Sequence, residues 1–310
     1  MMKRRQFIQN TLAAGTSAAL ACHSFSNPSA AREPIERSGP PRFQLALAAY
    51  SFRSYFSFMK ERPQKPADDG PAIDMAGFID YCTMHGFEAA ELTSYFFDPL
   101  PTADYFLELK RKAFQQGVAI SGTAIGNDFT VGKGPKLKQQ IQDAIKWIDN
   151  AAILGAPHIR FFAGTKKKID EQPERMPEAI AALEECAEHA ASKGIFLGVE
   201  NHGQLTAQQC LTIMQQVQSP WVGMNLDTGN FISEDPYADL VQCVPYAVNV
   251  QVKTTMKSPS GKKSPADLDR IGKILRDAGY QGFVVLEYEE ESPYTQVPKV
   301  ADSLRKALGI

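Results

Sequence analysis

The sequence predicts a single α/β domain folded as a closed (β/α)8 TIM barrel. Between residues 43 and 310, eight short apolar runs alternate with eight helix-like segments, which is the order that a barrel of parallel strands requires. No G-x-G-x-x-G motif follows the first apolar run, and this argues against an open dinucleotide-binding sheet. Several later runs end in oxygen-bearing side chains, as expected for a site at the carboxyl ends of barrel strands.

Each predicted strand is a run of apolar and small residues, which is typical of parallel strands covered by helices. The run Ile-Phe-Leu-Gly-Val at 195–199 is an example, and Gly194 directly before it is a helix-ending residue. The predicted strands cover residues 43–49, 87–92, 118–124, 158–162, 195–199, 222–227, 247–253 and 283–288.

The predicted helices carry apolar residues three and four positions apart. Ile141, Ile145, Ile148 and Ala152 form one such stripe, which predicts an amphipathic helix facing the core. Thr206 has the residue type of an N-cap. The predicted helices cover residues 74–85, 102–116, 136–154, 177–193, 206–217, 236–242, 265–278 and 296–308.

The first 26 residues have the features of an export signal. Lys3, Arg4 and Arg5 precede Phe7 and a small apolar stretch, and this pattern resembles a twin-arginine signal. The stretch is too short to span a bilayer, so no membrane span is expected. Residues 27–42 are predicted to be a linker and 43–310 the barrel. We expect an exported protein of the periplasm or cell envelope, with lipidation of Cys22 as an alternative to a soluble product.

Composition and charge limit the classes of function. The chain has 310 residues, of which 44% are hydrophobic and 22% charged, so it can bury a large core. Its formal net charge of −2 argues against a protein that grips nucleic acid, which usually has a basic face. The five cysteines include no C-x-x-C pair and predict buried thiols rather than a disulfide framework.

Four oxygen-bearing side chains occur at the ends of successive predicted strands: Glu200, Asp227, Gln251 and Glu287. Because the strands of a barrel end on one face, we expect these side chains to converge. Three crowded carboxylates repel one another unless a divalent cation lies among them. Oxygen ligands favour Mn²⁺ or Mg²⁺, with Co²⁺, Zn²⁺ or Fe²⁺ as alternatives. The opposing interpretation is that each acid is a separate loop cap or ion-pair partner.

Four motifs carry a resemblance to a known family: GVENHG at 198–203, NLDTGN at 225–230, VQVK at 250–253 and VLEYE at 285–289. With these motifs, residues 43–308 resemble the xylose isomerase-like sugar isomerase and epimerase superfamily. The resemblance implies a metal held by a Glu, an Asp, a His and a Glu. These positions fall on Glu200, Asp227, Gln251 and Glu287, so Gln251 departs from the pattern, and an amide is a weaker metal ligand than an imidazole. The resemblance also implies that Glu200 and Glu287 transfer the proton.

Further residues are candidates for binding the substrate, each with a structural alternative. Lys253 either faces the cavity or forms a structural ion pair, and Glu91 either contacts sugar or forms a buried salt bridge. Aromatic side chains at strand ends can stack on a sugar ring or simply pack the rim. The predicted substrate-binding residues are His202, Asn230, Lys253, Glu91 and Tyr50.

Together these features predict a metal-dependent sugar isomerase or epimerase that abstracts a proton next to a carbonyl of a small sugar. One alternative is a lyase, a dehydratase or a 3-keto-glycoside-cleaving enzyme that uses the same site. Another is a non-catalytic sugar-binding barrel. Phosphodiester hydrolysis on DNA is disfavoured, because it needs a histidine-rich site for several metal ions and the chain has only five histidines. The expected partner is a small-molecule sugar, no nucleic acid is expected, and a homo-oligomer is an open expectation.

Overall fold

The structure is a computed structural model that describes residues 32–310. The predicted export segment 1–26, with Cys22, lies outside the described residues, as does the first part of the predicted linker. Within residues 32–310, no helix has the length and apolar character needed to cross a membrane.

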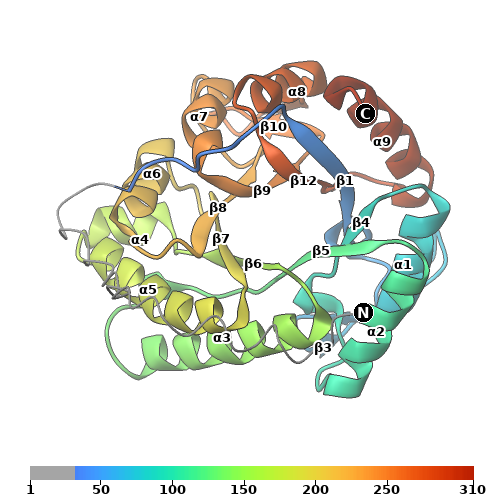
Figure 1. The fold of residues 1–310 in the computed structure, drawn as a ribbon, viewed down its shortest axis with the longest axis horizontal. Helices are drawn as coiled ribbons and strands as arrows, with labels where there is room; N and C mark the ends of the chain where they lie inside the picture. The colour runs from blue at the N-terminus through green and yellow to red at the C-terminus, as the bar shows by residue number, and fades with distance from the viewer. Residues whose placement is uncertain (1–31) are drawn as a thin grey trace, which may run out of the picture. The chain divides into compact units, whose positions relative to one another are not determined.

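Eight parallel strands close into a barrel in the order β1-β12-β9-β8-β7-β6-β5-β4 (Figure 1). The first and last strands close it, since β1 pairs with β12 from Arg42 beside Gln281 to Leu47 beside Leu286. This confirms the predicted barrel. The barrel strands are β1 (Arg42–Ala48), β4 (Ala89–Glu91), β5 (Ala119–Ala124), β6 (His158–Phe162), β7 (Phe196–Glu200), β8 (Val222–Asp227), β9 (Ala247–Val252) and β12 (Gln281–Leu286).

Helices surround the barrel (Figure 1). Thr206 caps its helix, as the sequence predicts, and forms a reciprocal capping box with Gln209. The α-helices are α1 (Met75–Met84), α2 (Ala103–Gln115), α3 (Pro135–Leu154), α4 (Lys166–Glu171), α5 (Arg175–Lys193), α6 (Ala207–Gln216), α7 (Pro236–Cys243), α8 (Leu268–Asp277) and α9 (Pro293–Leu308). Short 3-10 turns are η1 (Ala49–Phe52), η2 (Ser94–Phe96), η3 (Phe129–Val131) and η4 (Val244–Tyr246).

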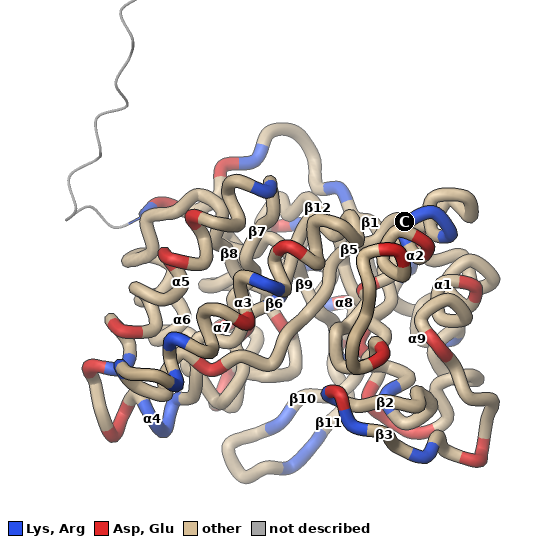
Figure 2. Tube along the Cα trace, turned by 90° about the horizontal axis from the view of Figure 1, so that it is seen from below, with Lys and Arg blue, Asp and Glu red and all other residues tan. Residues whose placement is uncertain are grey.

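Three local features differ from the sequence-based prediction. Residues 166–168, which lie outside the predicted helices, begin the short helix α4, which Thr165 caps by accepting a hydrogen bond from the Lys168 backbone N–H. Two small hairpins also form, β2 (Phe58–Met59) with β3 (Arg62–Pro63) and β10 (Thr255–Lys257) with β11 (Lys263–Pro265). Both hairpins lie at the same end of the barrel (Figure 2). They follow β1 and β9, so they flank the end where the barrel strands finish.

Residues 32–41, expected as part of a linker, pack across the opposite end of the barrel. The backbone N–H of Arg32 donates to the carbonyl of Gln215 at 2.9 Å, and that of Ile35 donates to the carbonyl of Pro245 at 3.0 Å. The guanidinium of Arg37 lies 5.2 Å from the ring centroid of Tyr280. This segment therefore covers the end where the strands begin, and it leaves the other end open for a site.

The side chain of His158 fills the barrel interior between two glycines. A Cβ on Gly122 would lie 2.5 Å from the His158 Nδ1, and one on Gly198 would lie 2.3 Å from its Nε2. Neither ring nitrogen has a hydrogen-bond partner within the described residues. Burial, followed by the charge of Arg160, lowers the pKa of His158 to about 3. The imidazole is therefore neutral in the folded protein at neutral pH.

This burial predicts a pH-dependent loss of stability. An unfolded histidine has a pKa of about 6.5, so below that pH the unfolded chain binds a proton that the folded chain excludes. The free energy of unfolding should then fall by up to about 1.4 kcal/mol per pH unit as the pH drops from about 6.5 towards 3. Urea unfolding at pH 7 and pH 4.5 should show this loss in the unmodified protein and a smaller loss in His158→Leu. If the free energies of unfolding of the unmodified protein and His158→Leu differ by the same amount at both pH values, the assignment of a neutral buried His158 is contradicted.

Candidate functional site

Four neighbouring strand ends bring the predicted metal ligands together. Glu200 is the last residue of β7 and Asp227 the last residue of β8. Gln251 lies next to the end of β9, in register with Asp227, and Glu287 directly follows β12. All four side chains are buried. The βα repeat therefore places polar groups from distant parts of the sequence at one end of the barrel core.

A cavity of ≈ 110 Å³ opens at these strand ends. Asp227 and Asn230 lie beside it, because both contact the ammonium of Lys253, which lines the cavity. The structure thus gathers all the predicted site residues in one place. Those that line the cavity are Tyr50, Glu91, Glu200, His202, Gln251, Lys253 and Glu287.

The ammonium of Lys253 lies at the centre of the acidic side chains. Its Nζ is 3.0 Å from Asp227 Oδ2, 3.3 Å from Glu289 Oε1 and 3.6 Å from Glu287 Oε1. It also donates to Asn230 Oδ1 at 3.0 Å. Only 12% of the Lys253 side chain is exposed, so these contacts replace most of its hydration. The lysine both faces the cavity and forms a structural ion pair, so the two interpretations of the sequence combine.

Glu200 is held by partners from two other segments. Its Oε2 lies 2.9 Å from Arg160 Nε, and its Oε1 accepts a hydrogen bond of 2.7 Å from Asn230 Nδ2. Arg160 also donates to the carbonyl of Ile125 at 2.7 Å and lies 4.1 Å from the ring centroid of Phe162. Asn230 therefore links Glu200 to Lys253, so that Lys253 and Arg160 belong to one network.

His202 lies at the edge of the cavity. Its ring stacks on Phe162, with centroids 4.2 Å apart. Burial lowers its pKa to about 4, and the nearby charges of Arg160 and Lys253 add to this effect. At neutral pH it therefore offers a neutral ring, which can form hydrogen bonds with a sugar hydroxyl.

A row of amides fixes the orientation of Gln251. Its Nε2 donates to Glu287 Oε2 at 2.8 Å and to Glu91 Oε1 at 3.2 Å. Its Oε1 accepts from Asn225 Nδ2 at 2.6 Å, and Asn225 Oδ1 accepts in turn from Asn249 Nδ2 at 2.7 Å. The amide nitrogen, not the oxygen, is therefore directed at the carboxyl groups.

The side chains, as the structure arranges them, do not fit the divalent cation that the sequence predicts. The position expected to supply a ligand oxygen, Gln251, presents a hydrogen-bond donor instead. The ammonium of Lys253 already lies between Asp227 and Glu287, where a second cation would be repelled. Both oxygens of Glu200 are engaged by Arg160 and Asn230. Within residues 32–310, no group of three or more His, Cys, Asp and Glu side chains is arranged to hold a metal ion.

The acidic groups of the site hold protons more tightly than free carboxyls. Burial raises the pKa of Glu200 to about 7, although Arg160 opposes the shift. Burial also raises the pKa of Glu91 to about 7, and that of Glu287 well above its usual range. These shifts favour the protonated form of Glu287 and place the titration of Glu200 near neutral pH. This is the combination that an acid and base pair requires.

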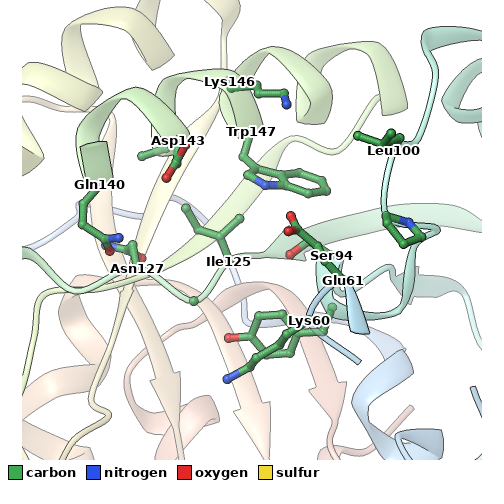
Figure 3. A pocket seen from close by; sticks show the side chains of 14 residues that line it. Lys60, Glu61, Ser94, Leu100, Ile125, Asn127, Gln140, Asp143, Lys146 and Trp147 are labelled. Carbon is green, nitrogen blue, oxygen red and sulfur yellow. The ribbon is translucent and has the colours of Figure 1, made fainter. Parts of the chain in front are cut away.

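A second, larger cavity of ≈ 490 Å³ adjoins the first, and the two share Lys60 and Tyr95 in their walls. On one side, helix α3 supplies Asp143 and Trp147, and the hairpin residues Lys60 and Glu61 lie opposite (Figure 3). The Nζ of Lys60 is 4.6 Å from the ring centroid of Tyr95. The mixture of a half-buried aromatic ring, Trp147, and polar groups suits a hydroxylated ligand.

Sequence analysis did not identify some of the residues that complete the site. Glu289 lies two positions beyond Glu287 and contacts Lys253. Arg160, by contrast, is a charged residue within the predicted strand 158–162, which makes it a candidate for contacting sugar or for a buried salt bridge, and the structure pairs it with Glu200. Asn225 has a similar position in β8. Lys60 comes from a hairpin of two-residue strands, which leaves too little periodicity to detect.

Comparison with known proteins places the fold. A sequence model of the family described as xylose isomerase-like TIM barrel matches residues 79–307. A search of curated proteins gave no match.

Three solved structures illustrate the likeness, and at these identities they establish the fold alone. D-psicose 3-epimerase from Clostridium cellulolyticum H10, solved with D-tagatose, is 17% identical, with coverage of 86% of this chain and 99% of that chain and a TM-score of 0.66. The 3-keto-D-glucoside 4-epimerase from E. coli is 15% identical, with coverage of 86% and 100% and a TM-score of 0.64. A xylose isomerase-like barrel from Mycobacterium smegmatis in complex with magnesium is 19% identical, with coverage of 86% and 96% and a TM-score of 0.62.

Proposed function

The chain belongs to the xylose isomerase-like TIM barrel family, and on this basis we propose that it is a sugar isomerase or epimerase that moves a proton next to a carbonyl group. The observation that carries the proposal is the pair of buried carboxyl groups, Glu200 and Glu287, at the strand ends beside two fixed cations. The structural neighbours named as sugar epimerases support a carbohydrate as the substrate.

In the proposed reaction, the carboxylate of Glu200 takes the proton from a C–H group beside the carbonyl. The electron pair of that C–H bond becomes a carbon–carbon double bond, and the carbonyl electrons move to the oxygen, which gains negative charge. The ammonium of Lys253 and the guanidinium of Arg160 stabilise this charge in a site shielded from water. Because the donor set does not fit Mn²⁺ or Mg²⁺, the proposal assigns no step to a metal.

The neutral carboxyl group of Glu287 then returns a proton. Return to the same carbon from the opposite face gives an epimer. Return to the former carbonyl carbon gives the isomeric sugar, provided that the proton of the adjacent hydroxyl group moves to the former carbonyl oxygen and leaves the new carbonyl behind. In either case Glu200 ends protonated and Glu287 ends ionised, so proton exchange with solvent resets the pair. Glu200 ends β7 and Glu287 directly follows β12, and these strands are separated by β8 and β9 in the barrel, so the two residues approach the cavity from different strands.

A second candidate function is elimination from a keto-glycoside, and the adjoining ≈ 490 Å³ cavity favours it. The same proton abstraction would produce the same anion, which would expel a substituent at the next carbon instead of taking the proton back. The larger cavity, with Lys60 and Tyr95 at the shared wall, offers space for that substituent.

Solvent exchange tests the proposal. The protein is incubated in deuterium oxide with a panel of ketohexoses, aldoses and 3-keto-glycosides, and the sugars are followed by NMR. We expect deuterium to enter at the carbon next to the carbonyl of at least one free sugar, together with its epimer or isomer. Release of a free aglycone with an unsaturated sugar would instead identify the elimination. A folded protein that exchanges no sugar of the panel would contradict both functions.

A further inference from the structure

We propose that the ammonium of Lys253 takes the place of a divalent cation in this barrel, so that the site works with a positive charge built into the chain. The inference deepens the proposed function and rests on it for the chemistry. Its first test is metal binding, which requires no substrate.

The first support is the shell of oxygen atoms around the ammonium. Four oxygens surround Nζ at 3.0 to 3.6 Å, and three of them belong to carboxyl groups. Two of these carboxyl groups, Asp227 and Glu287, are the ones expected to be metal ligands. The ammonium is thus bound by the same groups that would bind the ion.

The second support is the packing that holds the lysine there. A Cβ on Gly229 would lie 2.9 Å from both Cβ and Cδ of Lys253, so the glycine leaves room for the stem of the lysine. The backbone N–H of Lys253 donates to Thr228 Oγ1 at 3.1 Å. The segment directly after Asp227 therefore packs against the stem and the backbone of Lys253, which directly follows β9.

The third support is the residue that stands where an imidazole ligand is expected. The Gln251 amide donates to Glu287 and Glu91, and the hydrogen bond from Asn225 prevents its oxygen from turning towards them without losing that bond. One oxygen of Glu287 therefore accepts from the amide, and its other oxygen lies 3.6 Å from the ammonium of Lys253. The site therefore lacks the expected imidazole ligand, and the ammonium of Lys253 supplies a fixed positive charge in the same place.

The ammonium of Lys253 lies where an oxygen atom of the substrate would contact it. Lys253 lines the ≈ 110 Å³ cavity together with Glu200 and Glu287. An oxygen that becomes anionic there can accept a hydrogen bond from the Nζ group, which carries three donors. A single ammonium provides less charge than a divalent ion, and Arg160, paired with Glu200, is a further cation that lines the cavity.

The first test uses the unmodified protein. Mn²⁺ is titrated into the protein in a calorimeter, and thermal unfolding is followed with added Mn²⁺ or with EDTA. We expect no saturable heat of binding and the same unfolding temperature in both conditions, because a ligand that does not bind the folded state cannot stabilise it. Equimolar binding of Mn²⁺ that raises the unfolding temperature would overturn the proposal.

The second test rebuilds the metal site. The double variant Gln251→His and Lys253→Ala removes the ammonium and supplies an imidazole, so it should bind Mn²⁺ and gain thermal stability from it. The matched control, Gln251→His with Lys138→Ala, replaces an exposed lysine of α3 and retains Lys253, so it should not bind the ion. A double variant that shows a native circular dichroism spectrum and still binds no Mn²⁺ would count against the inference. If that variant does not fold, the titration of the unmodified protein decides.

The activity arm separates this inference from the proposed function. With any sugar that exchanges deuterium, EDTA should leave the exchange rate unchanged, Lys253→Met should lower it at least about tenfold, and Lys253→Arg should retain more of it. Exchange that stops in EDTA and returns with Mn²⁺ would overturn the role of Lys253 while preserving the isomerase function. If no sugar exchanges, the proposed function fails, and the Mn²⁺ titrations still test the substitution of the cation.

Discussion

Replacement of Glu200 by glutamine is expected to lower the rate of solvent deuterium exchange into the sugar by about 10²- to 10⁴-fold, the usual contribution of a positioned base. Glutamine has nearly the same shape and can still accept the hydrogen bond from Asn230, so the variant removes the base and preserves the packing. The measurement is the initial exchange rate by NMR, compared with Glu188→Gln, which changes an exposed acid on α5 and should leave the rate unchanged.

The pH dependence of the exchange rate provides an independent test of Glu200 as the base. Because burial raises the pKa of Glu200 to about 7, the carboxylate form increases as the pH rises through neutrality. The exchange rate of the unmodified protein should therefore increase between pH 6 and pH 8, and Glu200→Gln should lack this increase. An exchange rate that falls over this range would assign the base to a different group.

Replacement of Arg160 by methionine is expected to lower the free energy of unfolding by about 3–5 kcal/mol, because it leaves the buried carboxylate of Glu200 without its charged partner. Arg160 is buried, and it also donates to the carbonyl of Ile125, which would lose its partner as well. Urea unfolding at pH 8, where Glu200 is mostly ionised, measures the effect.

A double-mutant cycle shows whether the charge is the cause. Adding Glu200→Gln to Arg160→Met removes the uncompensated carboxylate, so the double variant should be more stable than the sum of the two single effects predicts. Arg111→Met, on the exposed side of α2, should change the free energy of unfolding by no more than about 0.5 kcal/mol. Strict additivity of Arg160→Met and Glu200→Gln would indicate that lost packing, not lost pairing, explains the instability.

Local patterns were sufficient to predict the barrel, because each strand and helix carries its own periodicity. The stripe of Ile141, Ile145 and Ile148 lies in α3, and the apolar run that ends in Glu200 is β7. The short elements were not predictable in this way. The hairpin of β2 and β3 pairs only two residues on each side, and β11 shortens the predicted helix at 265–278 to α8.

The meeting place of the site residues was also predictable, since strand ends in a barrel share one face. What the sequence did not reveal is the direction of each polar group. The orientation of Gln251 depends on Asn225 and Asn249, which are connected to it by hydrogen bonds. No periodic pattern in the sequence reveals these hydrogen bonds. The central position of Lys253 likewise depends on contacts from two different segments, residues 227–230 and residues 287–289. The spacing of acidic residues along the sequence therefore predicts that they form a cluster. The side chains packed around the cluster determine which cation can neutralise it.

The ammonium held among Asp227, Glu287, Glu289 and Asn230 has a consequence for how the protein depends on its surroundings. A charge that is part of the polypeptide is present as soon as the chain folds. It needs no supply of trace elements, chelating agents cannot remove it, and it cannot be replaced by copper or zinc, which outcompete manganese and magnesium for most sites. Such an enzyme would keep its activity during starvation for transition metals.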